Sequence, residues 1–189
     1  LFEDMALDPE LVRQLGNRIV DFQCEVIRGY AQAGADGIWG GDDWGLQDRL
    51  MISPTMWREF FKPWYERMFR TAHECGLFVY MHSCGKNNDI ISDLIDCGLD
   101  VIELHQPTVY GVDWLAEHAA GKLCFSTTAD IQRTLPYGDR EKIEDEVRAL
   151  REKLYRNGGL MYIVYGSLEA IGVDDATMAD YVRLCKKYA

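Results

Sequence analysis

Basic residues are scarce in this chain relative to acidic ones, and long hydrophobic runs are absent. Its 189 residues include 20 Lys and Arg against 31 Asp and Glu, so the formal net charge is −11 at pH 7. Nucleic acids and anionic membrane surfaces are bound through basic faces, and a membrane-spanning helix needs about 20 consecutive apolar residues. The sequence therefore argues against both nucleic acid and membranes as partners.

Clustered cysteines are also absent. The six cysteines are scattered along the chain, at positions 24, 75, 84, 97, 124 and 185, and no signal sequence precedes them. This pattern predicts reduced thiols in a cytoplasmic protein. We expect all of them except Cys84 to pack in the core as small hydrophobic residues.

No linker, low-complexity tract or proline-rich stretch divides the chain, so residues 1–189 are expected to form a single domain. One pattern recurs, a helix followed by a short apolar strand, which is typical of parallel α/β architecture. The five expected strands cover residues 36–40, 77–82, 101–105, 123–127 and 160–165. Composition and periodicity leave open whether these units form an open sheet or part of an eight-stranded barrel.

Helix start and stop signals separate these strands. One helix is predicted from Asp8-Pro9 to near Gly34, and a second from Ser53-Pro54 to Gly76, with a break near Phe61 caused by Pro63. Three further helices are expected to begin at N-cap aspartates, namely Asp113, Asp139 and Asp174. After the second of these, apolar residues at helical spacing predict a buried stripe of Ile143, Val147, Leu150 and Leu154.

The segment His82-Ser83-Cys84-Gly85 follows the second predicted strand and carries the clearest chemical signal. If the strand continues to His82, its period of two turns His82 and Cys84 to the same side. An imidazole and a thiolate make half of a tetrahedral zinc site. The alternative is that His82 ends the strand and Cys84 packs as a small hydrophobic residue.

Polar residues also follow the other predicted strands, where sites of parallel α/β proteins lie. Glu103 and His105 share one face of the third strand, and His105 is a candidate third zinc ligand. Asp42 and Asp43 follow the first strand; one acid can face the site while the other bonds to backbone, or both can belong to a solvated turn. Asp130 follows the fourth strand as a site residue or a helix cap. Polar ends on every strand favour one shared site.

Several motifs occur in the order found in the uroporphyrinogen decarboxylase (URO-D) superfamily, which the chain resembles over nearly its whole length. They are Asp36-Gly37-Ile38-Trp39 with Gly41 to Gly45, Ile52 to Met56, Phe61 to Trp64, His82 to Gly85, Asp93-Leu94-Ile95 with Gly98 to Val101, Gln106-Pro107, and Asp130 before Leu135 to Gly138. The resemblance implies a (β/α)8 TIM-barrel type fold. About five βα units are present, corresponding to the C-terminal portion of the barrel.

The resemblance is closest to the zinc- and corrinoid-dependent methyltransferase branch of that superfamily. Decarboxylases carry a Gly-His-Gly motif where this chain has Gly166-Ser167-Leu168, whereas the His-x-Cys motif is similar to that of the methyltransferases. The resemblance implies that His82 and Cys84 bind zinc. The later cysteine ligand of that branch is replaced near Ser167, so His105 is expected to complete the site.

The implied reaction moves a methyl group from a methyl-corrinoid, carried by a corrinoid protein or present as cobalamin, to a small thiol bound by zinc. Asp42, Asp43, Glu103 and Asp130 are expected to orient the metal ligands. Trp44 and Tyr80 either form walls of a macrocycle site or pack in the core.

Two other interpretations stay open. One is a metal-free decarboxylase acting on an acidic tetrapyrrole, for which few basic residues lie near strand ends: Arg49, Lys86 and Arg133. The other is a non-catalytic barrel portion that self-associates as a homo-oligomer, because an uncovered parallel sheet exposes backbone groups and apolar faces.

Overall fold

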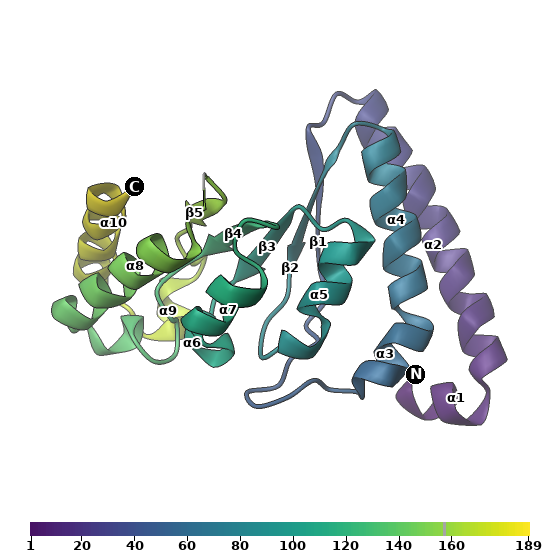
Figure 1. Cartoon of the computed structure of the whole chain (residues 1–189), viewed down its shortest axis with the longest axis horizontal. Helices are drawn as coiled ribbons and strands as arrows, with labels where there is room; N and C mark the ends of the chain where they lie inside the picture. The colour runs from purple at the N-terminus through teal and green to yellow at the C-terminus, as the bar shows by residue number, and fades with distance from the viewer. Residues whose placement is uncertain (157) are drawn as a thin grey trace.

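A five-stranded parallel sheet forms the centre of the computed structural model, which describes residues 1–156 and 158–189 (Figure 1). The strands are neighbours in chain order, β1-β2-β3-β4-β5. They are β1 (Gly37–Gly41), β2 (Phe78–His82), β3 (Val101–Leu104), β4 (Cys124–Thr127) and β5 (Leu160–Tyr162). All predicted strands are therefore present, although β5 ends before the predicted Tyr165.

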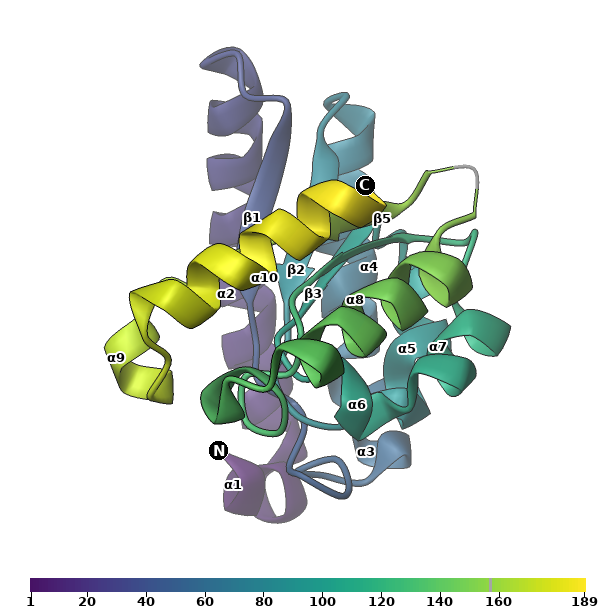
Figure 2. The same ribbon diagram turned by 90° about the vertical axis from the view of Figure 1, so that its left-hand side faces the viewer.

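Helices connect successive strands and pack against one another along the sheet. The longer ones are α2 (Pro9–Gln32), α4 (Lys62–Glu74), α5 (Asn88–Cys97), α8 (Arg140–Leu154) and α10 (Asp175–Tyr188). Shorter ones are α1 (Phe2–Leu7), α3 (Pro54–Phe60), α6 (Pro107–Tyr110), α7 (Val112–His118), α9 (Leu168–Ile171) and the 3-10 helix η1 (Leu135–Tyr137). Figure 1 and Figure 2 show α2 beside α4 next to β1, and α8 beside α10 next to β5. Within the described residues, no helix combines the length and apolar character needed to cross a membrane.

Most of the predicted helix signals are confirmed. The carboxylates of Asp139 and Asp174 accept backbone N–H bonds at the starts of α8 and α10, and Asp8 and Ser53 do the same for α2 and α3. The predicted break falls at Phe61, between α3 and α4. The predicted stripe on α8 is buried, with Ile143, Val147, Leu150 and Leu154 at 1% exposure or less.

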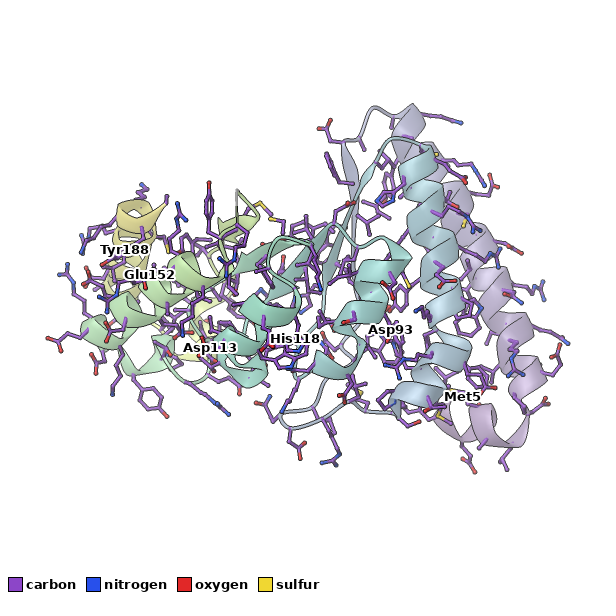
Figure 3. The ribbon with its side chains drawn as sticks, in the orientation of Figure 1. Met5, Asp93, Asp113, His118, Glu152 and Tyr188 are labelled. Atoms are coloured by element: carbon purple, nitrogen blue, oxygen red, sulfur yellow. The ribbon has the colours of Figure 1, made fainter. Side chains whose placement is uncertain are left out.

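The predicted N-cap at Asp113 is wrong. Helix α7 begins two residues earlier than a cap at Asp113 would place it, at Val112, and follows Gly111, whose φ of 81° lies in the left-handed region. Asp113 therefore lies inside the first turn and caps no N–H group. Its carboxylate instead pairs with Lys153 Nζ of α8 at 2.6 Å, and Figure 3 labels it on α7.

Asp93 joins α5 to the two helices before it. Its carboxylate accepts hydrogen bonds from Arg58 Nε and Lys62 Nζ, each at 2.8 Å, and it is labelled between these helices in Figure 3. Burial opposes ionisation, but the bonds from Lys62 and Arg58 hold the pKa of Asp93 below its ordinary value. This ion-pair cluster fixes the helix layer outside β2 and β3.

The two faces of the sheet differ in burial. Val79, Met81, Ile102, Leu104 and Phe125 point toward the helices and are buried in the core. On the opposite face, here called the open face, Trp39 and Phe78 are 67% and 66% exposed. The register pairs one residue from each strand in a row across this face, namely Gly41, His82, Glu103, Ser126 and Met161. Because residues paired in register point to one side, this row forms the floor of the candidate site.

Candidate metal centre

His82, Cys84 and His105 converge at the carboxyl ends of β2 and β3. One ligand atom from each residue lies within 4.8 Å of the others, and among the described residues no other group of three or more His, Cys, Asp or Glu side chains does so. His82 Nε2 lies 3.2 Å from Cys84 Sγ, and the two imidazole rings are 4.7 Å apart between centroids. The structure therefore brings together the three residues that the sequence predicted as metal ligands.

The backbone around Cys84 is held by a contact between two glycines. Gly85 has a φ of +73°, and a Cβ on it would lie 2.1 Å from the carbonyl oxygen of Gly45. Gly45 N donates to Cys84 O at 3.1 Å, and Lys86 N donates to Leu46 O at 2.8 Å. Only glycine permits both the left-handed backbone and this close approach. The turn after β2 is thereby locked onto the loop after β1, which fixes the position of the thiol.

Glu103 contacts both imidazoles. Its Oε1 lies 3.0 Å from His82 Nδ1 and 3.2 Å from His105 Nε2. A carboxylate only accepts hydrogen bonds, so His82 Nδ1 carries its proton toward Glu103. The other nitrogen of the neutral His82 ring is then a lone-pair donor, the form in which histidine binds metals. His105 Nε2 approaches the same carboxylate oxygen without a hydrogen bond between them.

Asp42 and Asp43 point in different directions, as expected for adjacent residues. Asp43 Oδ1 accepts from Cys84 N at 2.8 Å and lies 3.4 Å from His82 Nε2, so this acid faces the cluster. Asp42 accepts a hydrogen bond from the Tyr65 hydroxyl instead. Burial of its carboxylate raises the pKa of Asp42, and the charge of Asp43 adds to that effect, although the bond from Tyr65 opposes it.

Trp44 and Asp130 lie outside the cluster. Trp44 is 7% exposed and packs against Phe61 and Trp57, which is the core position rather than the wall of a macrocycle site. Asp130 is fully buried, and its Oδ1 accepts from the backbone N–H groups of Gln132 and Arg133, so it caps the turn after β4. The sequence did not distinguish the core role of Trp44 or the capping role of Asp130 from a role in the site, because tryptophan and aspartate occur in both.

The local electrostatics favour neutral ligands in the metal-free protein. Burial raises the pKa of the Cys84 thiol to about 11, with smaller contributions from the Asp43 and Glu103 charges. Burial and the neighbouring His82 lower the pKa of His105. Both effects disfavour charge in the absence of a cation, and a bound cation favours the thiolate. Two imidazoles and one thiolate fit zinc, which in catalytic sites commonly has three protein ligands and one open position.

Three features of the site were not predicted from the sequence. Tyr80 Oη lies 2.5 Å from Glu103 Oε2 and 2.6 Å from Ser126 Oγ. Ser83 is buried, and its hydroxyl donates to Asp42 O at 2.6 Å, which supports the turn from below. The Tyr165 ring lies edge-on to His105, with centroids 5.0 Å apart. The contact of Tyr80 with the site could have been predicted from its position two residues before His82, which puts both side chains on the same face of β2.

Comparison with known proteins identifies a family and a solved structure of similar fold. The sequence profile described as Uroporphyrinogen decarboxylase (URO-D) matches residues 1–165. A curated protein of Xanthomonas axonopodis pv. citri (strain 306), named uroporphyrinogen decarboxylase, is 30% identical over 165 residues, which cover 80% of this chain and 42% of that protein. The chain therefore spans less than half of that relative.

Among solved structures, a methyltransferase from Methanosarcina mazei superposes with a TM-score of 0.75 at 18% identity. The match covers 99% of this chain and 52% of that one. At this identity the likeness shows the fold alone. It confirms the predicted fold class, a portion of a (β/α)8-type barrel with five βα units.

Proposed function

The chain belongs to the uroporphyrinogen decarboxylase (URO-D) family, and on that basis we propose that its site holds zinc and serves methyl transfer from a methyl-corrinoid to a small thiol. The observation that carries this proposal is the convergence of His82, Cys84 and His105, whose ligand atoms lie within 4.8 Å of one another. Because the chain spans 42% of the curated relative, methyl transfer is proposed for the whole protein and metal binding for this chain.

The proposed chemistry divides between the metal and the residues around it. His82, Cys84 and His105 would hold the metal, which would supply Lewis-acid activation of a substrate thiol so that a thiolate is available at neutral pH. The transfer would form a sulfur–carbon bond and break the cobalt–carbon bond of the co-substrate with its electron pair left on cobalt, and the thiol proton would go to solvent.

The remaining site residues of this chain act by orientation. Glu103 accepts the Nδ1–H of His82 and lies 3.2 Å from His105 Nε2, and so orients the two imidazoles. Asp43 accepts from the backbone N–H of Cys84 and holds the thiol-bearing turn against the loop after β1.

Zinc content is the direct test of the metal site. Elemental analysis of the purified protein is expected to give about one zinc per chain, and Cys84→Ala is expected to lose it. Cys75→Ala is the matched control, because Cys75 is partly buried like Cys84 but lies at the end of α4, and it should keep the zinc. A wild-type protein without zinc, or a Cys84→Ala variant with full zinc content, would overturn the proposal.

A metal-free decarboxylase is the second candidate, favoured by the name of the relative that is 30% identical. An enzyme for an acidic tetrapyrrole needs cationic groups to hold the carboxylate arms. Arg49 is exposed and pairs with Asp48 at 2.9 Å, and Arg133 is exposed on the turn after β4. Binding of an acidic tetrapyrrole by zinc-free protein, with no methyl transfer from methylcobalamin to a thiol, would favour this candidate instead.

A further inference from the structure

We propose that Tyr80 is a positioning residue of the metal centre: its hydroxyl fixes the Glu103 carboxylate, which in turn orients both imidazoles. The inference rests on the proposed zinc site and extends it by one layer of side chains. The sequence leaves Tyr80 either as a wall of a macrocycle site or as a core residue. In the structure its hydroxyl points to Glu103 and Ser126.

The strand register explains how Tyr80 reaches these two residues. Tyr80 precedes His82 by two positions, so both side chains lie on the open face of β2. His82, Glu103 and Ser126 are paired in register in the row above it. Tyr80 is paired with Val101 in the row below, and its long side chain extends upward to lie between the carboxylate of β3 and the hydroxyl of β4. No shorter side chain at this position would reach both.

Donor and acceptor counting determines the direction of these bonds. The phenol has one proton, and the Glu103 carboxylate can only accept, so Tyr80 donates to Glu103 Oε2. Ser126 is fully buried, and its hydroxyl then donates to the phenol oxygen at 2.6 Å. The chain of donors runs from Ser126 through Tyr80 to Glu103.

The consequence for Glu103 is that both of its oxygens are engaged. Oε1 accepts the N–H of His82 and lies 3.2 Å from His105 Nε2, and Oε2 accepts the Tyr80 hydroxyl. A carboxylate held at only one oxygen can rotate about its terminal bond, since that torsion is broad. With Oε2 fixed, Oε1 stays in the one position that reaches both rings. Removing the Tyr80 hydroxyl is therefore expected to loosen both metal ligands together.

The test is the zinc affinity of Tyr80→Phe, measured by competition with a chromophoric chelator. Loss of an outer partner of a metal ligand typically lowers metal affinity by about 10- to 100-fold, and we expect a loss in that range. Ser126→Ala should lower the affinity in the same direction but less, and it provides a second variant if Tyr80→Phe does not fold. Tyr162→Phe is the matched control, because its hydroxyl donates to Val147 O on the helix side of the sheet, away from the site.

Cobalt substitution supplies a readout that a purely structural role would not change. The visible spectrum of Co²⁺ bound to thiolate and imidazole reports the geometry of the ligands, so Tyr80→Phe should shift it while Tyr162→Phe leaves it unchanged. Wild-type affinity and spectrum in both Tyr80→Phe and Ser126→Ala would overturn the inference and leave the zinc site intact. A wild-type protein that binds neither metal would overturn the proposed function and this inference with it.

Discussion

Glu146 of α8 shows how burial of a single carboxylate couples stability to pH. Its Oε1 accepts from the backbone N–H of Asp130 at 3.0 Å. Burial raises the pKa of Glu146 to about 7, against hydrogen bonds from Thr134 and the Asp130 backbone. The folded protein therefore binds a proton between about pH 4.5 and 7 that the unfolded chain has already released.

This residue gives a pH prediction. Because the native state holds the extra proton, the free energy of unfolding should fall as pH rises from about 5 to about 7, by up to about 3 kcal/mol. Glu146→Gln keeps the acceptor for Asp130 and should flatten this fall, as measured by urea unfolding at a series of pH values. The exposed Glu152 on the same helix, labelled in Figure 3, is the control, and Glu152→Gln should follow the wild type. An unchanged pH dependence in Glu146→Gln would contradict the prediction.

The connections after β1 and β2 act as one unit at the scale of elements. The turn that carries Cys84 and the loop that carries Asp43 meet backbone to backbone at Gly45 and Gly85. The helix layer outside them is tied by the bonds from Arg58 and Lys62 to Asp93. The proposed metal ligands His82 and Cys84, at and after the end of β2, are therefore supported from the loop side and from the helix side.

Gly85→Ala is expected to break this unit. The added Cβ would lie 2.1 Å from Gly45 O, so one of the two backbones must move. We expect a loss of at least about 2 kcal/mol in the free energy of unfolding, together with weaker zinc binding. Gly76→Ala isolates the steric part, because Gly76 has a similar φ of +75° with nothing within 4 Å of the added Cβ. Equal losses of stability in the two variants, measured by urea unfolding, would rule out a special role for the close contact.

At the scale of the whole molecule, apolar surface remains uncovered at the β1 end. Helix α2 carries a row of exposed side chains, here called the α2 stripe: Leu11, Leu15, Ile19 and Phe22, each at least 51% exposed. The open face adds Trp39 and Phe78. β1 pairs with β2 alone in the described sheet, so its other edge presents free backbone groups. Surfaces of this kind bind other protein surfaces.

We therefore expect this chain, studied by itself, to self-associate through the α2 stripe and the β1 edge. Light scattering after size-exclusion chromatography should give a mass above 21.7 kDa, and Phe22→Lys should shift it toward that of a monomer. Tyr137→Lys replaces another exposed aromatic residue, 74% exposed on η1, and should not change the mass. A monomeric wild type at micromolar concentrations would contradict this expectation.

The sequence by itself determined the parallel strands, the helix caps at Asp8, Ser53, Asp139 and Asp174, and the break at Phe61. These features follow from local rules, because strand period, capping side chains and proline act within a few residues. The same period of two placed His82 and Cys84 on one side of the second strand. It likewise placed Glu103 and His105 together on one side of the third strand. The local rules were wrong at Asp113, because the left-handed Gly111 starts the helix earlier than a cap at that aspartate would.

Only the tertiary structure decided which polar residues meet. Asp42 and Asp43 are equivalent in sequence, and their roles differ because Tyr65 lies near one and the Cys84 backbone near the other. Glu103 reaches both histidines, and Tyr80 reaches Glu103, because the register aligns β2 with β3. Trp44 lies in the core because α3 and α4 bring Trp57 and Phe61 against it. The physical reason is that each of these contacts except that of Glu103 with His105 joins residues more than ten positions apart, and strand register and helix packing, not local propensity, set such distances.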